Sequence, residues 1–128
     1  MGRYLLDTHA LLWLQDDNPR LSEKVKSIIL DRNNELHVSI ASFWEITIKK
    51  SLGKLVLGYS LTQLYHACIT SDIIIIPIEL TNLNRVEELP FHHKDPFDRL
   101  IAAIAIDNDM TVITLDENVS KYPVHTLW

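Results

Sequence analysis

Cysteine and long hydrophobic runs are both scarce in this chain. Its one cysteine, Cys68, among 128 residues rules out a disulfide within the chain and any CxxC zinc site. The longest apolar run, residues 73–78 with Pro77 inside it, is far shorter than the roughly 20 residues of a membrane-spanning helix. The N-terminus also lacks the pattern of a secretory signal. These absences are typical of a reducing compartment, and we expect a cytoplasmic protein.

Basic residues and glycine-rich nucleotide-binding motifs are scarce as well. The sequence has neither a GxxxxGK[ST] phosphate loop nor a GxGxxG motif. Its 12 Lys and Arg residues against 17 Asp and Glu residues give a formal net charge of −5. A protein that holds nucleic acid through the phosphates usually carries a net positive charge. Either nucleic acid is not the partner, or the excess acid is concentrated in a site that holds cations.

What the chain does have is the pattern of one α/β domain. Apolar residues make up 47% of it and charged residues 23%, as in globular proteins, and we expect residues 1–128 to form a single domain. Short apolar runs alternate with segments whose apolar residues recur at helical spacing, which predicts a mostly parallel sheet with helices. The isoleucine run at 73–76 lacks alternation, as is typical of a strand buried on both faces. The predicted strands span residues 3–6, 36–39, 73–76, 111–114 and 124–127.

Capping residues predict where the helices lie. Ser42 is a good N-cap for a helix over residues 43–52, and Gly53 follows that helix as a C-terminal cap should. The other predicted helices begin near residues 10, 22, 61, 80 and 96.

Four acids fall where the strands end or the following helices begin. Asp7 directly follows the first strand, and Asp116 follows the fourth after Leu115. Glu45 and Asp98 fall in the first turns of helices that would follow strands. Ligands of open parallel sheets bind beyond the carboxyl ends of the strands. We therefore expect all four acids at the same edge of the sheet.

Taken singly, most of these acids have an ordinary structural explanation. Asp98 suits the positive end of a helix dipole, Glu45 can pair with Lys49 one turn later, and Asp116 can simply end a strand. Asp7 differs, because its apolar neighbours leave it no solvated face and a buried carboxylate needs a partner. Their joint placement is what favours a shared site.

Carboxylates gathered in one place repel one another unless a cation lies among them. Oxygen ligands favour Mg²⁺ or Mn²⁺. Such a cation can orient a scissile phosphate, activate water and stabilise the charge that develops during phosphodiester hydrolysis. It would also explain how an acidic protein handles nucleic acid, because it reverses the local charge.

The histidines and two other acid-dependent families give weaker matches. His92 and His93 are the only adjacent pair among six histidines, and we interpret them as solvated loop residues rather than ligands. A haloacid-type phosphatase needs a second acid two residues after Asp7, where this chain has His9. A receiver domain needs its phospho-acceptor after a middle strand, with an acid pair before it. Neither pattern fits.

Four segments form an ordered set of motifs over nearly the whole chain. They are residues 6–13 (LDTHALLW), 39–46 (SIASFWEI) with Lys49 and residues 53–55, 93–103 (HKDPFDRLIAA), and 114–116 (TLD) with Tyr122. These segments resemble the motifs of PIN-domain nucleases, specifically the VapC-type toxins of bacterial toxin–antitoxin pairs. The resemblance implies a three-layer α/β fold, with about five mostly parallel strands and helices on both faces. It also implies a Mg²⁺- or Mn²⁺-dependent endoribonuclease.

The resemblance assigns roles to the acids position by position. Asp7 and Asp98 match direct metal ligands, Glu45 a ligand or an orienter of metal-bound water, and Asp116 a ligand of a second or weaker metal. All four are therefore candidate catalytic residues. Asp95 also matches the motif, but we assign it to capping the helix.

Supporting roles are assigned to polar neighbours. Thr8 and Thr114 are candidates for holding carboxylates or water in place. In this subfamily an aromatic residue usually follows the last acid, whereas residues 117–119 here are Glu, Asn and Val. The expected rim for an RNA backbone consists of Lys49, Lys50, Lys54, Lys94 and Arg99.

The resemblance further implies a homodimer and a cognate antitoxin, whose Arg or Lys would reach the carboxylates. Trp13, Trp44 and Phe43 are candidates to dock it, although core packing explains such aromatics equally well. Two alternatives stay open. One is a non-catalytic module that binds antitoxin and, through it, operator DNA, and the other is a DNA-directed nuclease. No short motif identifies an RNA target.

Overall fold

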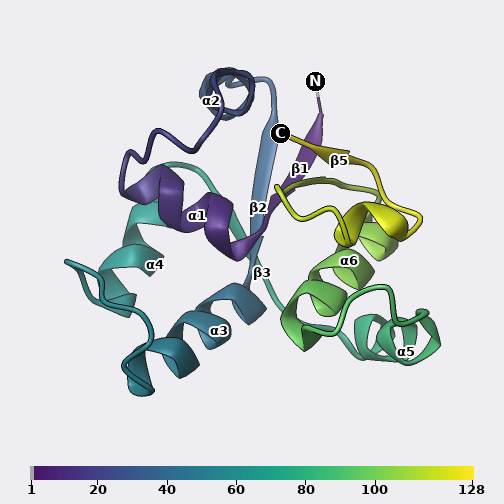
Figure 1. Cartoon of the computed structure of the whole chain (residues 1–128). Helices are drawn as coiled ribbons and strands as arrows, with labels where there is room; N and C mark the ends of the chain where they lie inside the picture. Colours follow the sequence, from purple (N-terminus) through teal and green to yellow (C-terminus); the bar gives the residue numbers. More distant parts are fainter. Residues whose placement is uncertain (1) are drawn as a thin grey trace.

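Five short strands form one parallel sheet in the computed structural model, which describes residues 2–128 (Figure 1). The strand order is β3-β2-β1-β4-β5, and every neighbouring pair is parallel. The expected α/β fold is confirmed. The order reverses between β1 and β4, which is where ligands of such sheets bind. The strands are β1 (Arg3–Leu6), β2 (Glu35–Ser39), β3 (Ile74–Ile76), β4 (Thr111–Ile113) and β5 (Thr126–Leu127).

Helices cover both faces of the sheet, as expected (Figure 1). Helices α1, α2 and α4 lie over one face, and α5 and α6 lie over the other. Helix α3 follows β2 and contributes residues to the apolar clusters of both faces. No helix within residues 2–128 is long and apolar enough to cross a membrane. The helices are α1 (Thr8–Gln15), α2 (Glu23–Leu30), α3 (Ile40–Ser51), α4 (Leu61–Thr70), α5 (Leu80–Glu88) and α6 (Pro96–Asn108), with a short 3₁₀ helix at Val119–Lys121.

Strands β1 and β4 are buried on both faces because their side chains alternate between two apolar clusters. Leu6 and Ile113 join the cluster under α1, α2 and α4, whereas Leu5 and Val112 join the cluster under α6. All four side chains are fully buried. At about 1.5–3 kcal/mol for each large apolar side chain, this burial fixes β1 and β4 firmly side by side. The carboxyl ends of these strands therefore form a rigid base for the site.

Two predictions about individual elements are wrong. The N-cap of α3 is Ser39, whose side chain accepts a hydrogen bond from the Ala41 N–H, and not Ser42. Glu45 consequently lies in the second turn of α3. The isoleucine run was expected to be buried on both faces, but β3 is an edge strand and Ile74 is 46% exposed. A run of β-branched residues suits an edge strand as well as a central one.

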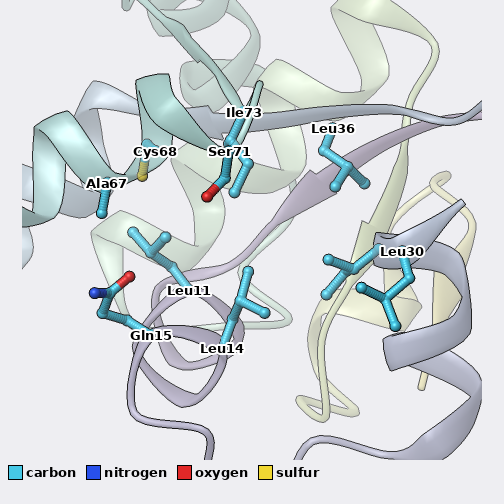
Figure 2. Close-up of a pocket in the computed structure, with 10 residues that line it drawn as sticks. Leu11, Leu14, Gln15, Leu30, Leu36, Ala67, Cys68, Ser71 and Ile73 are labelled. Atoms are coloured by element: carbon cyan, nitrogen blue, oxygen red, sulfur yellow. The ribbon is translucent and has the colours of Figure 1, made fainter. Parts of the chain in front are cut away.

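A cavity of about 290 Å³ opens between α1, α2, α4 and the β2–β3 side of the sheet (Figure 2). Leu11 and Leu14 of α1 face Ala67 and Cys68 of α4 across it. No acid lines this cavity, so it is separate from the carboxylates. Cys68 is 2% exposed, and burial raises the pKa of its thiol to about 11.

Cys68 is expected to react slowly with thiol reagents in the native protein. The rise in pKa from 9.0 to about 11 lowers the thiolate fraction at pH 8 by about 100-fold, and burial limits access further. A disulfide reagent such as DTNB should label the protein much faster in concentrated urea than in buffer. Equal rates in the two solutions would show that the cavity wall opens readily.

Candidate functional site

Asp7 lies where β1 ends and α1 begins. Its backbone N–H donates to the carbonyl of Ile113 at 3.2 Å, which continues the β1–β4 pairing by one residue. Its side chain caps α1, because Oδ1 accepts a hydrogen bond from the Ala10 N–H at 2.8 Å. The residue is only 4% exposed. The buried, partnered position expected for this acid is the one observed.

Thr114 connects Asp7 to Asp116. Burial raises the pKa of Asp7, and hydrogen bonds from Thr114 and the Ala10 N–H only partly oppose it. The charge of Asp116 raises that pKa further. The Thr114 hydroxyl oxygen also accepts a hydrogen bond from the Asp116 N–H at 3.0 Å. A single threonine therefore fixes the two acids that follow β1 and β4 relative to each other.

Glu45 is held at both carboxylate oxygens. The Thr8 hydroxyl donates to Oε1 at 2.7 Å, and this hydroxyl lies 3.0 Å from the Ser42 hydroxyl. Lys49, one turn later, places its Nζ 2.8 Å from Oε2, as the sequence predicts. The bond to Glu45 raises the pKa of Lys49, as do the charges of Asp95 and Asp98. Glu45 is 4% exposed and has a fixed orientation.

Asp98 lies in the first turn of α6, and its pKa is strongly raised. Asp95 caps this helix, as expected, because its Oδ1 accepts a hydrogen bond from the Asp98 N–H at 3.4 Å. Burial raises the pKa of Asp98 to about 7, and the negative charges of Asp95, Glu45 and Asp7 act in the same direction. The proximity of His93 opposes them. Three other acids are thus close enough to Asp98 to disfavour its ionisation.

Asp116 is the most accessible of the four acids, with its side chain 32% exposed. Burial acts to raise its pKa, but hydrogen bonds from His93 and from the Asn118 N–H outweigh that effect, so the pKa lies below its usual value. The Nε2 atom of His93 lies 2.6 Å from Asp116 Oδ2, and Asn118 N lies 2.8 Å from Oδ1. Asp116 therefore stays ionised beside its more protonatable neighbours.

His93 was expected to be a solvated loop residue, and this expectation is wrong. Its side chain is 13% exposed, and its Nε2 lies between Asp116 Oδ2, at 2.6 Å, and Asp98 Oδ2, at 3.2 Å. His92, in contrast, is exposed as expected. One feature of the sequence does distinguish His93 as a site residue, because it is the first residue of the third matched segment, five residues before Asp98. Two adjacent histidines in a loop cannot otherwise be distinguished from sequence.

The donor set at this edge suits a hard divalent cation. His93, Asp98 and Asp116 each offer one ligand atom, and these atoms lie within 4.8 Å of one another. Asp7 and Glu45 act on the same place through their charges. Apart from the contacts of His93, Lys49 makes the one direct ion pair with any of the four acids in the described residues 2–128. This pair offsets part of their negative charge. Carboxylate oxygens with uncompensated charge are ligands that Mg²⁺ and Mn²⁺ prefer.

Arg99 does not belong to the surface rim expected for an RNA backbone. It is 9% exposed, and its guanidinium donates to the carbonyls of Val86, at 2.9 Å, and Leu89, at 2.8 Å, at the C-terminal end of α5. Lys54 and Lys94 are exposed, and Lys50 is half-buried. The surface that could carry a phosphate backbone is therefore smaller than expected.

The three aromatic candidates for docking a partner differ in their exposure. Phe43 is 4% exposed and belongs to the core, so it is not available for docking. Trp13 is half-buried, with its ring 5.5 Å from that of Trp128. Trp44 is 56% exposed and packs edge-on against Phe97, the neighbour of Asp98, at 5.1 Å between ring centroids. Trp44 is the aromatic residue that borders the acids.

Comparisons with known proteins agree with this architecture. The model of the PIN domain family matches residues 4–124. Similar solved structures include VapBC2 from Rickettsia felis bound to a DNA fragment from their promoter, with 17% identity, a TM-score of 0.72, and coverage of 98% of this chain and 97% of that chain. Others are VapBC-1 from nontypeable Haemophilus influenzae (18%, 0.61, 98% and 96%) and FitAcB from Neisseria gonorrhoeae (19%, 0.64, 98% and 96%). At such identities the likeness shows the fold alone. No curated protein sequence matches this chain significantly.

Proposed function

The chain belongs to the PIN domain family, whose members are typically nucleases, and we propose that it is a metal-dependent endoribonuclease acting as the toxin of a toxin–antitoxin pair. The observation that carries the proposal is the group of Asp98 and Asp116 around one point, with Asp7 and Glu45 acting on the same place. This arrangement is costly for a purely structural role, because it raises the pKa of Asp98 to about 7.

Asp98 and Asp116, whose ligand atoms lie within 4.8 Å of each other, would hold Mg²⁺ or Mn²⁺ directly. This differs from the pair Asp7 and Asp98 that the resemblance implies, and Asp7 and Glu45 would complete the site. When bound, the cation would polarise the scissile phosphate and lower the pKa of a water molecule beside it. It would also reverse the local negative charge, so that a phosphate could approach a protein with a net charge of −5.

The surrounding residues would keep the carboxylates in fixed orientations. Thr8 and Lys49 each engage one oxygen of Glu45, so this side chain is pre-oriented to accept a proton or to bind water. Thr114 fixes Asp7 relative to Asp116. Such pre-orientation contributes to catalysis because no side chain must be reorganised during the reaction.

The antitoxin is the proposed protein partner, and Trp44 is its proposed docking residue. This ring is 56% exposed and borders Asp98 through Phe97. A partner's Arg or Lys placed beside Trp44 would satisfy the same carboxylates as a cation does. An antitoxin partner is supported by the similar structures from Rickettsia felis (VapBC2), Haemophilus influenzae (VapBC-1) and Neisseria gonorrhoeae (FitAcB), which are toxin–antitoxin complexes. We also propose a homodimer and a cytoplasmic location.

Incubation of the purified chain with RNA tests the proposed activity. We expect cleavage with Mg²⁺ or Mn²⁺ and none after chelation with EDTA, because the acids alone cannot bring a phosphate and a nucleophile together. Single-stranded DNA of the same sequence, assayed beside the RNA, identifies a DNA-directed nuclease if it is cut faster. RNA cleavage that persists undiminished in EDTA would contradict the metal-dependent mechanism.

A non-catalytic role in promoter binding is the second candidate, since the Rickettsia felis neighbour is bound to promoter DNA. In this case the acids would serve only to dock the antitoxin. The chain would then bind its antitoxin but would cleave neither RNA nor DNA with either cation.

A further inference from the structure

The His93 ring is engaged at both nitrogen atoms, and this determines where its proton lies. Nδ1 lies 3.0 Å from the Asp95 backbone N–H, which can only donate, so Nδ1 must present a lone pair. The ring proton is then on Nε2. This N–H donates to Asp116 Oδ2, at 2.6 Å, and Asp98 Oδ2 lies beside it, 3.2 Å from the same nitrogen. His93 is therefore a hydrogen-bond donor to Asp116 that also contacts Asp98.

The backbone around His93 is anchored as firmly as the ring. Its N–H donates to the hydroxyl oxygen of Tyr122 at 3.1 Å, and this hydroxyl donates to the carbonyl of Pro90 at 2.8 Å. Tyr122 is 3% exposed and packs in the cluster under α6. The imidazole is thereby held between the start of α6 and the end of β4, which come from distant parts of the sequence.

The contacts of the two carboxylates leave room for a cation between them. Each carboxylate has about four lone-pair positions, and the bond from His93 uses one position of Asp116. Asp116 has one further bond, from the Asn118 N–H to Oδ1. The His93 contact with Asp98 Oδ2, at 3.2 Å, leaves the lone pairs of that carboxylate available.

We propose that His93 is a positioning residue: its Nε2–H holds Asp116 Oδ2 in place beside Asp98 and remains a donor to Asp116 when the divalent cation binds. The proposal rests on the proposed function, because it concerns the same metal centre. It distinguishes His93 from a third metal ligand, which would need its Nε2 lone pair and would have to move the proton to Nδ1, opposite the Asp95 N–H.

The tautomer is measurable in the intact, folded chain. Long-range ¹H–¹⁵N NMR spectra of the protein labelled with ¹⁵N-histidine separate protonated from unprotonated ring nitrogens, and His93→Gln identifies the His93 signals. We expect a protonated Nε2 and an unprotonated Nδ1, both without Mg²⁺ and at saturating Mg²⁺. A proton on Nδ1 in the Mg²⁺-bound protein would overturn the proposal and make His93 a ligand.

Mn²⁺ affinity, measured by calorimetry, tests what the donor contributes. Loss of such an outer partner typically weakens metal binding by about 10–100-fold, which is the expected rise in the Mn²⁺ Kd for His93→Ala. His93→Gln, whose amide N–H reaches nearly the same place as Nε2–H, should recover affinity to within about threefold of wild type. His92→Ala, which changes the exposed neighbour, is the matched control and should not alter the Kd. Unchanged or tighter binding by His93→Ala would overturn the positioning role, and so would a folded His93→Gln that binds as weakly as His93→Ala.

These readouts separate the failure of this inference from the failure of the proposed function. The binding and NMR measurements use no RNA, so the predicted pattern without any RNA cleavage would leave His93 as a positioning residue of a metal site and reject the nuclease. Metal-dependent cleavage together with an unaltered Mn²⁺ Kd in His93→Ala would support the nuclease and reject the positioning role of His93.

Discussion

Replacing Asp98 with asparagine is expected to lower metal-dependent RNA cleavage by at least about 100-fold, because it removes a ligand charge at the centre of the site. The same change should stabilise the metal-free protein. Asp98 is partly buried, and its ionised form is disfavoured by this burial and by the charges of Asp95, Glu45 and Asp7. A neutral side chain of the same shape relieves this repulsion. Loss of activity with a gain in stability is the pattern expected of a residue retained for chemistry.

The stability difference should depend on pH in a defined direction. The pKa of Asp98 rises from its ordinary value of 3.8 to about 7 in the folded protein, so the folded state binds the proton more tightly than the unfolded state. The contribution of this group to stability is therefore fully present below about pH 4 and is lost as the pH rises through about 7. Without metal, the stability of Asp98→Asn relative to wild type, measured by thermal unfolding, should therefore increase as the pH rises over this interval. Saturating Mg²⁺ should reverse the order at pH 8.

Asp95→Asn is the matched control for this prediction. It removes one negative charge from the same turn, but asparagine is as good an N-cap as aspartate, so α6 should keep its cap. Cleavage by Asp95→Asn should therefore fall much less than cleavage by Asp98→Asn. If the two variants lose activity equally, the total charge of the turn matters and Asp98 is not a specific ligand.

The positions of the acids were predictable because they depend on local patterns at element ends. Asp7 follows a short apolar strand, and Asp98 follows a cap and a proline, so each is fixed by its immediate neighbours. Parallel pairing then brings these ends to one edge of the sheet. The start of α3 was missed because Ser39 and Ser42 are equally good caps, and only the end of β2 decides between them.

The roles of His93 and Arg99 could not be predicted because they depend on contacts between distant segments. His93 is defined by Asp116 and Tyr122, which lie more than 20 residues away and come beside it only when the chain returns after β4. Arg99 is adjacent to Asp98 in sequence, but the helical turn points it toward the end of α5. Adjacent residues on α6 thus serve different purposes.

Arg99→Met is expected to destabilise the protein by about 2–4 kcal/mol, because hydrogen bonds to charged donors are worth about 1.5–3 kcal/mol each and the Leu89 carbonyl left without this donor is buried. Methionine retains most of the volume of the side chain but donates no hydrogen bond to the carbonyls of Val86 and Leu89. It also loses the contact of the guanidinium with the Phe91 ring, 4.2 Å away. Urea unfolding followed by circular dichroism measures the difference.

Lys94→Met is the control that distinguishes structural support from RNA binding. Lys94 is exposed and precedes the same helix, so its replacement should change the free energy of unfolding by less than about 0.5 kcal/mol. If Lys94 belongs to a phosphate-binding rim, this variant should also weaken RNA binding and make that binding less dependent on salt concentration. An Arg99→Met protein that unfolds like wild type but binds RNA more weakly would show that Arg99 contacts the RNA backbone after all. Because the guanidinium connects the end of α5 to the first turn of α6, its loss should also loosen the helix start that carries Asp98.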